Sequence, residues 1–296
     1  MEQNYINQEE VSRRIPGRLA VNKVVRGLFL TSTLFGLVVL AILLYDVITD
    51  SWGWIDWQFL TSVMSFNEEA AGIIGAISGT LWLMLIVGPV TMIIGVATAI
   101  YLEEYVKEGR VRTFFETNVA NLAGVPSIVF GLLGLTVFVR LMNMGSVVLA
   151  GGLTMSLLVL PIVIVSAQES LRAVPSYLRE ASFGMGATRW QTIRSVVLPA
   201  ALPSILTGMI LAMSRAIGET APLIALGIPA LLIPLPSGLF DSFTVLPVQV
   251  YYWTIDAALN QNYASLAAAT IVVLLVLMFI LNSAAILIRN KFQQRF

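Results

Sequence analysis

Residues 180–199 read Glu-Ala-Ser-Phe-Gly-Met-Gly-Ala-Thr-Arg-Trp-Gln-Thr-Ile-Arg-Ser-Val-Val-Leu-Pro, and they separate two long apolar segments. Several charged residues lie in this stretch or just before it: Arg172, Arg179, Glu180, Arg189 and Arg194. The hydrocarbon core of a bilayer does not hold so many charges close together. We therefore expect the stretch to lie in water at a membrane face.

The spacing inside this polar stretch predicts two short helices. The first runs through Ser176–Phe183, after which Gly184 and Gly186 loosen the backbone, because glycine accepts dihedral angles that other residues resist. A second helix restarts near Thr188. A bent helix pair with an apolar face and a charged rim suits docking on another protein, although periodicity alone also fits an ordinary loop.

The second of these helices has a recognisable apolar face. Trp190, Ile193 and Val197 follow the i, i+3, i+7 spacing. Pro199 stands where a following helix can begin, since its missing N–H costs nothing in a first helical turn.

Composition identifies a membrane protein. The 296 residues are 57% hydrophobic and 11% charged, with a mean hydropathy of +0.86, whereas soluble domains carry about 25% charged residues. The sequence contains no cysteine and no histidine, which removes disulfides, thiolate chemistry and the commonest general base. It contains no phosphate-binding P-loop, and its zero net charge gives no sign of nucleic-acid binding.

Six stretches are long and apolar enough to cross a bilayer as helices, which needs about 20 residues. The fold class is therefore all-α, a polytopic membrane protein with six spans, and no removable signal peptide is expected. The spans are expected at about Val24–Tyr45, Gly75–Leu102, Val119–Met142, Val147–Ala167, Pro203–Ile228 and Ala264–Ile288.

Basic residues predict the orientation of these spans. Fifteen of the 17 lysines and arginines fall in segments that share one side of the membrane, and the opposite loops carry none. Basic loops face the cytoplasm. We therefore expect cytoplasmic segments at 1–23 and 289–296, a first span with an outer loop at 24–70, and a transport domain at 71–288 that includes a cytoplasmic loop at 168–199.

The fifth predicted span carries two opposite charges. Arg215 and Glu219 stand four residues apart and share a helix face, and Gly218 and Pro222 can break the helix beside them. Mutual neutralisation is one interpretation. The other is a substrate path, because charges inside a span are expensive and commonly functional. The planar guanidinium fork matches carboxylate or phosphate oxygens, so the path would suit an oxyanion.

Arg140 lies near the outer end of the third predicted span. Its side chain either reaches the outer headgroups or contributes to the mouth of a pore.

The polar stretch resembles the EAA loop of ABC importer permeases. That family's pattern is Glu-Ala-Ala, three residues, Gly, nine residues, Ile-x-Leu-Pro, and here Ser182 and Val196 replace one Ala and the Ile. In the family this loop fits a groove on the ATPase subunit. The resemblance implies that coupling to the ATPase rests on these residues: Arg179, Glu180, Ala181, Gly186, Leu198 and Pro199.

Three further segments resemble permease subunits of the phosphate-specific ABC transporter, PstA-type rather than PstC-type. They are NLAGVPSIVFG at 121–131, RAIGETAPL at 215–223 and FTVLPVQVYYW at 243–253. The resemblance implies the MetI-like (type I) importer fold, a PstC-type sibling, ATP-binding subunits on the cytoplasmic face, and an external phosphate-binding protein. It implies a non-enzymatic chain that passes inorganic phosphate, without a cofactor of its own, while ATP binds a partner.

Three alternatives remain open from the residues. An importer of another oxyanion, such as sulfate or molybdate, would share Arg215 and the loop. A secondary transporter driven by an ion gradient would usually show two matching broken helices, and only one broken, charged span is found. An intramembrane enzyme lacks support, since the usual catalytic motifs are missing.

Overall fold

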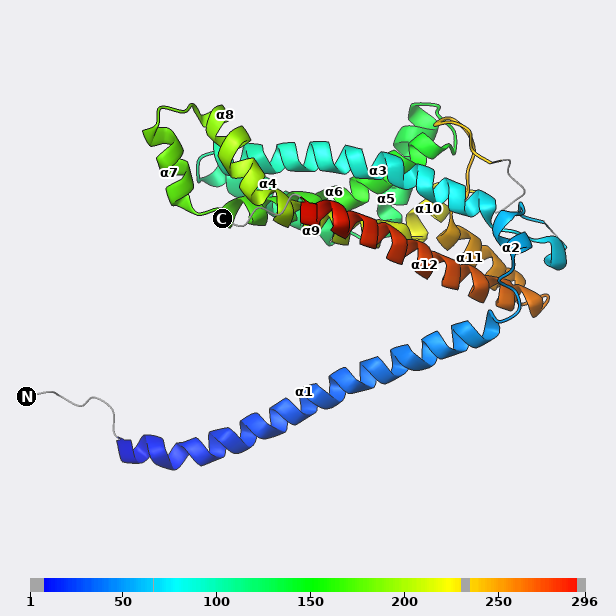
Figure 1. Ribbon diagram of the computed structural model, residues 1–296, viewed down its shortest axis with the longest axis horizontal. Helices are drawn as coiled ribbons and strands as arrows, with labels where there is room; N and C mark the ends of the chain where they lie inside the picture. Colours follow the sequence, from blue (N-terminus) through cyan, green and yellow to red (C-terminus); the bar gives the residue numbers. More distant parts are fainter. Residues whose placement is uncertain (1–7, 66, 230–234, 292–296) are drawn as a thin grey trace, which may run out of the picture. The chain divides into compact units, whose positions relative to one another are not determined.

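The computed structural model describes residues 8–65, 67–229 and 235–291 (Figure 1). Within these residues the fold is all-α, as predicted, and the single β-bridge joins Val147 to Ser242. The chain divides into two units, Met1–Asp50 and Ser51–Phe296.

The first unit contains α1, a single helix over Gln8–Asp50 that includes Pro16. Its part from Ile15 to Asp50 is long and apolar enough to cross a membrane. The predicted span of Val24–Tyr45 lies inside it.

The second unit holds the remaining helices, of which α6 is the centre. It packs mainly against α3 and α9, and α12 packs on α9 and on α11. In order, the elements are α2 (Trp57–Thr61), the 3₁₀-helix η1 (Glu68–Ala70), α3 (Ile74–Ile100), the π-helix η2 (Tyr101–Tyr105), α4 (Arg110–Ala123), α5 (Ser127–Gly134), the π-helix η3 (Leu135–Leu141), α6 (Val148–Arg172), α7 (Ser176–Gly184), α8 (Arg189–Thr192), the π-helix η4 (Ile193–Val197), α9 (Leu198–Gly218), α10 (Ala221–Ala225), α11 (Leu246–Asp256) and α12 (Asn262–Lys291).

Small residues allow the central helices to approach closely, as is usual in membrane proteins. A methyl group added at Gly152 of α6 would meet Ile86 of α3, and one added at Gly208 of α9 would meet Ser166 of α6. Gly131 and Gly134 of α5 pack just as closely, because they abut Pro222 and Thr154. Gly124 makes no such contact and instead ends α4.

Among the described residues, five helices can each cross a membrane, and a bent pair makes six if it counts as one span. The predicted boundary of that third span is wrong. Instead of one helix over Val119–Met142, α4 ends at Ala123 and a new helix starts at Ser127, bent by 98°. Pro126 causes the break, because it donates no hydrogen bond and disfavours helical dihedrals at the residue before it.

The fifth predicted span, Pro203–Ile228, is also corrected. The helix ends at Gly218, Glu219 is extended with φ −79° and ψ 125°, and the short α10 follows. At its other end the helix does not begin at Pro199. The segments α8, η4 and α9 form one membrane-crossing helix over Arg189–Gly218, because the π-helical turn ahead of Pro199 keeps the backbone continuous.

Between the fifth and sixth predicted spans lies helix α11, which was not predicted from the sequence. Trp253 of α11 is fully buried against α2 and α12 residues, while Tyr251 remains exposed. The strand-like segment before α11 closes the start of α6, because the amides of Val148 and Leu149 donate to the carbonyls of Asp241 and Leu239 at 3.0 and 2.9 Å. Backbone groups at this helix start are thereby satisfied.

Candidate functional site

The two opposite charges of the fifth span lie where α9 ends. Arg215 is in the last turn of α9, and its Nε donates to Oε1 of Glu219 at 3.2 Å. The Arg215 side chain is 51% exposed and that of Glu219 is 18% exposed. The guanidinium is therefore open on the surface of this unit rather than buried in its core, and one carboxylate holds it.

The helix break beside this pair is packed against α5 at Pro222 and faces open space at Gly218. Pro222 is buried at the start of α10, and its backbone lies against Gly131 of α5. Gly218 is exposed, with no atom within 4 Å of an added methyl group apart from the helix itself. The segments 121–131 and 215–223 thus meet in space, which their sequence positions did not reveal.

Arg140 stands apart from this arrangement. It lies in the π-helix η3 with an exposed side chain, and no ion pair involves it in the described part of the chain. Its predicted contribution to a substrate path therefore stays a prediction.

The polar loop forms a helical hairpin, α7 and α8, as the sequence predicts (Figure 1). Gly186 adopts φ +83°, a left-handed conformation that favours glycine, and Thr188 starts α8 with a capping box to Gln191. Ser182 and Thr192, both buried, join the two helices through hydroxyl oxygens 2.9 Å apart.

Four large apolar side chains of this hairpin are exposed: Tyr177, Phe183, Met185 and Trp190, with Met185 84% exposed. The predicted common face of Trp190 with Ile193 and Val197 is wrong, because Ile193 and Val197 are buried within the unit. Glu180 and Ala181 are exposed, whereas Leu198 and Pro199 are half-buried. Contiguous exposed apolar side chains are typical of a docking surface, so the four exposed apolar residues are the hairpin's candidate contacts with another protein.

Arg179 holds the base of the hairpin to the membrane helices. Its Nε and Nη2 lie 3.3 and 3.0 Å from Oε1 of Glu104. Its Nη1 and Nη2 also donate to the carbonyls of Val174 and Leu171, at the end of α6, at 2.7 and 2.8 Å. Arg179 therefore caps the end of α6 and also binds Glu104 of η2. Its side chain lies beneath the hairpin and is not part of the hairpin's exposed surface.

Glu103 is the centre of a second ionic contact at the same end. Its two carboxylate oxygens lie 2.5 and 2.6 Å from Nη2 of Arg112 and Nη2 of Arg172, and its side chain is 7% exposed. Gln168 of α6 donates to it at 3.2 Å, and Glu116 of α4 shares both arginines. This group, Glu103, Arg112, Glu116 and Arg172 with Glu104 and Arg179 beside it, is the loop-base network.

The sequence reading missed all three acidic members of the loop-base network, Glu103, Glu104 and Glu116. The signal was an acidic pair, Glu103-Glu104, at the end of the second apolar run, followed by Arg112. The π-helical turn η2 over Tyr101–Tyr105 places both carboxylates inward, which a regular helix pattern does not predict.

One continuous helix connects the hairpin to the ion pair. It runs from Arg189 to Gly218, which are 30 residues. At 1.5 Å per residue its length is about 45 Å. The hairpin helix α8 and Arg215 therefore lie on a single continuous element.

A family model described as "Binding-protein-dependent transport system inner membrane component" matches residues 91–295. The phosphate transport system permease protein PstA of Haemophilus influenzae is 32% identical over 262 residues, 86% of this chain and 90% of the relative. PstA 1 of Mycobacterium tuberculosis is 36% identical over 69% of this chain and 68% of its own. The probable ABC transporter permease YqgI of Bacillus subtilis is 31% identical over 70% of each chain.

Solved structures share the fold at low sequence identity. A chain of the MetNI methionine ABC transporter superposes with a TM-score of 0.60 at 19% identity, over 75% of this chain and 96% of its own. A chain of a bacterial ABC transporter for alginate superposes with a TM-score of 0.61 at 14% identity. The match covers 95% of this chain and 100% of the alginate transporter chain. The fold is that of ABC importer permeases, as the sequence predicts.

Proposed function

This chain belongs to the family of binding-protein-dependent transport system inner membrane components, and we propose that it passes inorganic phosphate inward, driven by ATP on a partner chain. It is an ABC importer permease and a multi-pass membrane protein. The observation that carries the proposal is the unbroken helix Arg189–Gly218, which joins the exposed hairpin to the Arg215–Glu219 pair.

Phosphate as the solute is supported by chemistry and by relatives. Arg215 presents a planar, permanently charged donor fork that fits tetrahedral oxyanions. The Haemophilus influenzae relative named for phosphate transport aligns over 86% of this chain, a share long enough to include Arg215. Other oxyanions fit the same guanidinium, and the name of YqgI states no substrate.

Glu219 gives the proposed site a way to release its solute. Glu219 accepts from Arg215 at 3.2 Å, and an arriving anion competes with it for the guanidinium. Because the carboxylate returns when the anion leaves, Arg215 does not become a permanent anion trap. The exposed side of Arg215 faces a second permease subunit of the PstC type in this proposal.

Energy enters at the hairpin. The apolar side chains of Tyr177, Met185 and Trp190 dock on an ATP-binding subunit at the cytoplasmic face, and the loop-base network carries the push into α3, α4 and α6. An external phosphate-binding protein delivers the solute at the opposite end, where α2 lies (Figure 1). This orientation, with both chain termini cytoplasmic, follows the distribution of basic residues.

The test is phosphate uptake into proteoliposomes that contain the complete complex. We expect uptake to need ATP and to persist when ionophores collapse ion gradients. Arg215→Gln should lower uptake at least about tenfold, the equivalent of 1.4 kcal/mol, while Arg140→Gln serves as the matched single-charge comparison. Normal uptake by Arg215→Gln would exclude the anion path, and stronger uptake of sulfate than of phosphate would reassign the solute.

The coupling role has a separate test. Glu180→Lys reverses an exposed charge on the hairpin without touching the loop-base network. We expect the ATP-binding subunit to bind this variant more weakly in co-purification. Unchanged association and unchanged uptake would show that the hairpin does not couple.

A further inference from the structure

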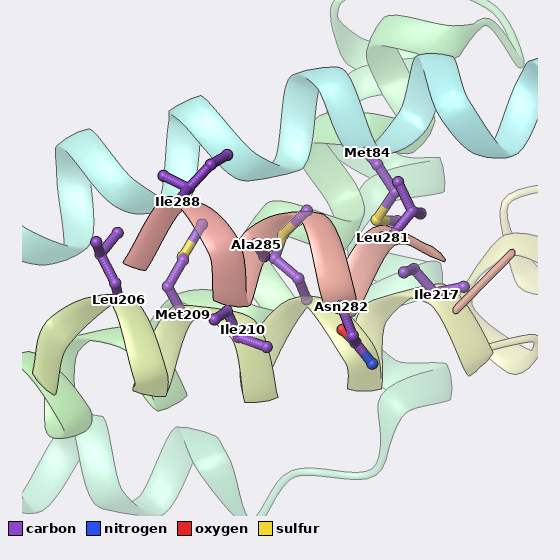
Figure 2. A pocket seen from close by; sticks show the side chains of 10 residues that line it. Met84, Leu206, Met209, Ile210, Ile217, Leu281, Asn282, Ala285 and Ile288 are labelled. Atoms are coloured by element: carbon purple, nitrogen blue, oxygen red, sulfur yellow. The ribbon is translucent and has the colours of Figure 1, made fainter. Parts of the chain in front are cut away.

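A cavity of about 240 Å³ opens between α9 and α12, with Met84 of α3 at its back (Figure 2). Side chains of Leu206, Met209 and Ile217 line it from α9, and those of Leu281, Ala285 and Ile288 line it from α12. Asn282 contributes the one polar side chain to this lining. Because water needs polar partners, such an apolar space is not suited to hold water.

The length of the cavity matches one leaflet of a bilayer. It extends along α9 from Leu206 to Ile217, and the eleven steps between them span about 16 Å at 1.5 Å per residue. The hydrocarbon core of a bilayer is about 30 Å thick. The flexible side chains of Met84, Met209 and Met213 in its wall can adapt to an irregular apolar chain.

A cation stands at one end of this cavity. Arg289 follows Ile288 directly, and its Nη1 lies 3.4 Å from the hydroxyl of Thr207, beside Leu206. Its Nε and Nη2 donate to the side-chain oxygen of Asn290, and no carboxylate pairs with it in residues 15–65, 67–229 and 235–291. A guanidinium has five donors, so this one has capacity for a phosphate group.

We propose that this cavity holds an acyl chain of an anionic phospholipid whose phosphate is bound by Arg289. The lipid belongs to the leaflet on the Arg289 side, which is the cytoplasmic leaflet in the predicted topology. Anionic lipids attract basic residues at helix ends on that side. The opposite end of the cavity reaches Ser214 of α9, whose hydroxyl donates to Asn282 at 2.7 Å, one residue before Arg215.

The lipid therefore fills the seam that ties the end of α9 to α12. Its binding depends on the cavity and on Arg289, and not on which solute is transported. A wrong assignment of the solute would leave this inference untouched, so the two can fail separately.

Native mass spectrometry of the complex, purified from liposomes with equal amounts of phosphatidylglycerol and phosphatidylcholine, tests the proposal. We expect the unmodified complex to retain phosphatidylglycerol about tenfold over phosphatidylcholine. Ala285→Phe fills the cavity and should abolish retention. Ala284→Phe is the matched control, since Ala284 is exposed beside it and does not line the cavity. Equal retention by these two variants would overturn the proposal.

The charge is tested by a variant that leaves the cavity intact. Arg289→Gln should remove the preference for phosphatidylglycerol, whereas Lys291→Gln, an exposed cation two residues on, should keep most of it. A preference unchanged in Arg289→Gln would contradict the assignment. The chain has no native cysteine, so Ala285→Cys offers a single reactive thiol. A cross-link from that thiol to a neighbouring protein chain would assign the cavity to a helix and exclude the lipid.

Discussion

The loop-base network and the Arg215–Glu219 pair are two charged regions with opposite designs. Glu103 is 7% exposed and contacts two arginines and a glutamine. Arg215 is 51% exposed and has one carboxylate partner at 3.2 Å. Buried, multiply bonded charges hold elements in place, whereas an exposed guanidinium with one partner is available to a ligand. The comparison teaches that burial and partner number separate an anchor from a binding site.

The first prediction breaks the anchor. Glu103→Gln removes the carboxylate between Arg112 and Arg172 and should destabilise the protein by about 2 kcal/mol, because two half-buried or exposed arginines lose a counter-charge and keep only Glu116 or Glu169 as partners. Thermal unfolding in detergent measures this loss. Glu169→Gln is the matched control, since Glu169 is 65% exposed with one contact to Arg172, and its effect should stay below about 1 kcal/mol.

The second prediction concerns the Arg215–Glu219 pair and compares its effect on stability with that of the loop-base network. Arg215→Gln should lower uptake at least about tenfold but leave the unfolding temperature nearly unchanged, because exposed ion pairs contribute about 1 kcal/mol or less. The same two measurements on Glu103→Gln should show the larger loss in stability. Loss of stability in Arg215→Gln equal to that in Glu103→Gln would remove the distinction between anchor and site.

The third prediction concerns the clamp under the hairpin. Arg179→Lys keeps the charge but loses the fork that contacts Glu104 and two carbonyls together, so we expect a loss of about 1.5 kcal/mol. ATP hydrolysis by the complex should then proceed with less phosphate moved per ATP. Arg194→Lys, at an exposed position of η4, should change neither quantity.

These regions differ in how far the sequence predicted them. The charge distribution and the apolar runs were sufficient for the all-α class, the span number and the helical hairpin. Gly218 and Pro222 predicted the break after α9, although the span was drawn across it. The break at Val125-Pro126 was not located, because a hydropathy window averages over single prolines and glycines. Glu103 and Glu104 were overlooked since a π-helical turn, which has no clear sequence pattern, directs them inward.

The exposure of the Arg215 side chain could likewise not be predicted from the sequence. The spacing of Arg215 and Glu219 predicted their ion pair, yet which side of α9 meets α6 depends on Gly208 packing against Ser166. Packing partners of this kind lie far apart in the chain.

The fourth prediction tests the hairpin turn. Gly186→Ala places a side chain at φ +83° and should cost about 1 kcal/mol in stability. Gly184→Ala, in the last turn of α7 with open space around it, should be neutral or slightly stabilising. Equal changes in unfolding temperature for Gly186→Ala and Gly184→Ala would show that a side chain at position 186 does not strain the turn.

The smallest effect is expected at the end opposite to the hairpin. Three donors hold the pKa of Asp241 below its usual range: the Ser237 hydroxyl, the Ser237 amide and, more weakly, the Gly238 amide. Because the folded-state pKa is lowered, the stability that Asp241 contributes is present above its unfolded pKa and is lost as pH falls through the folded value. Asp241→Asn should make folding stability less dependent on pH in the acid range, as measured by thermal unfolding at a series of pH values. The same pH dependence in the variant and the unmodified protein would contradict this prediction.

The central claim is that one continuous helix carries movement of the hairpin to Arg215. Spin labels at Gln191→Cys and Leu211→Cys, both exposed, enclose η4, Pro199 and Pro203. Double electron–electron resonance on the complex should give one distance between the two labels, with and without ATP. That distance should be about 30 Å, because the labels are 20 residues apart on a helix that rises about 1.5 Å per residue. A second distance that appears with ATP would show that the helix bends at the π-turn and would contradict the account.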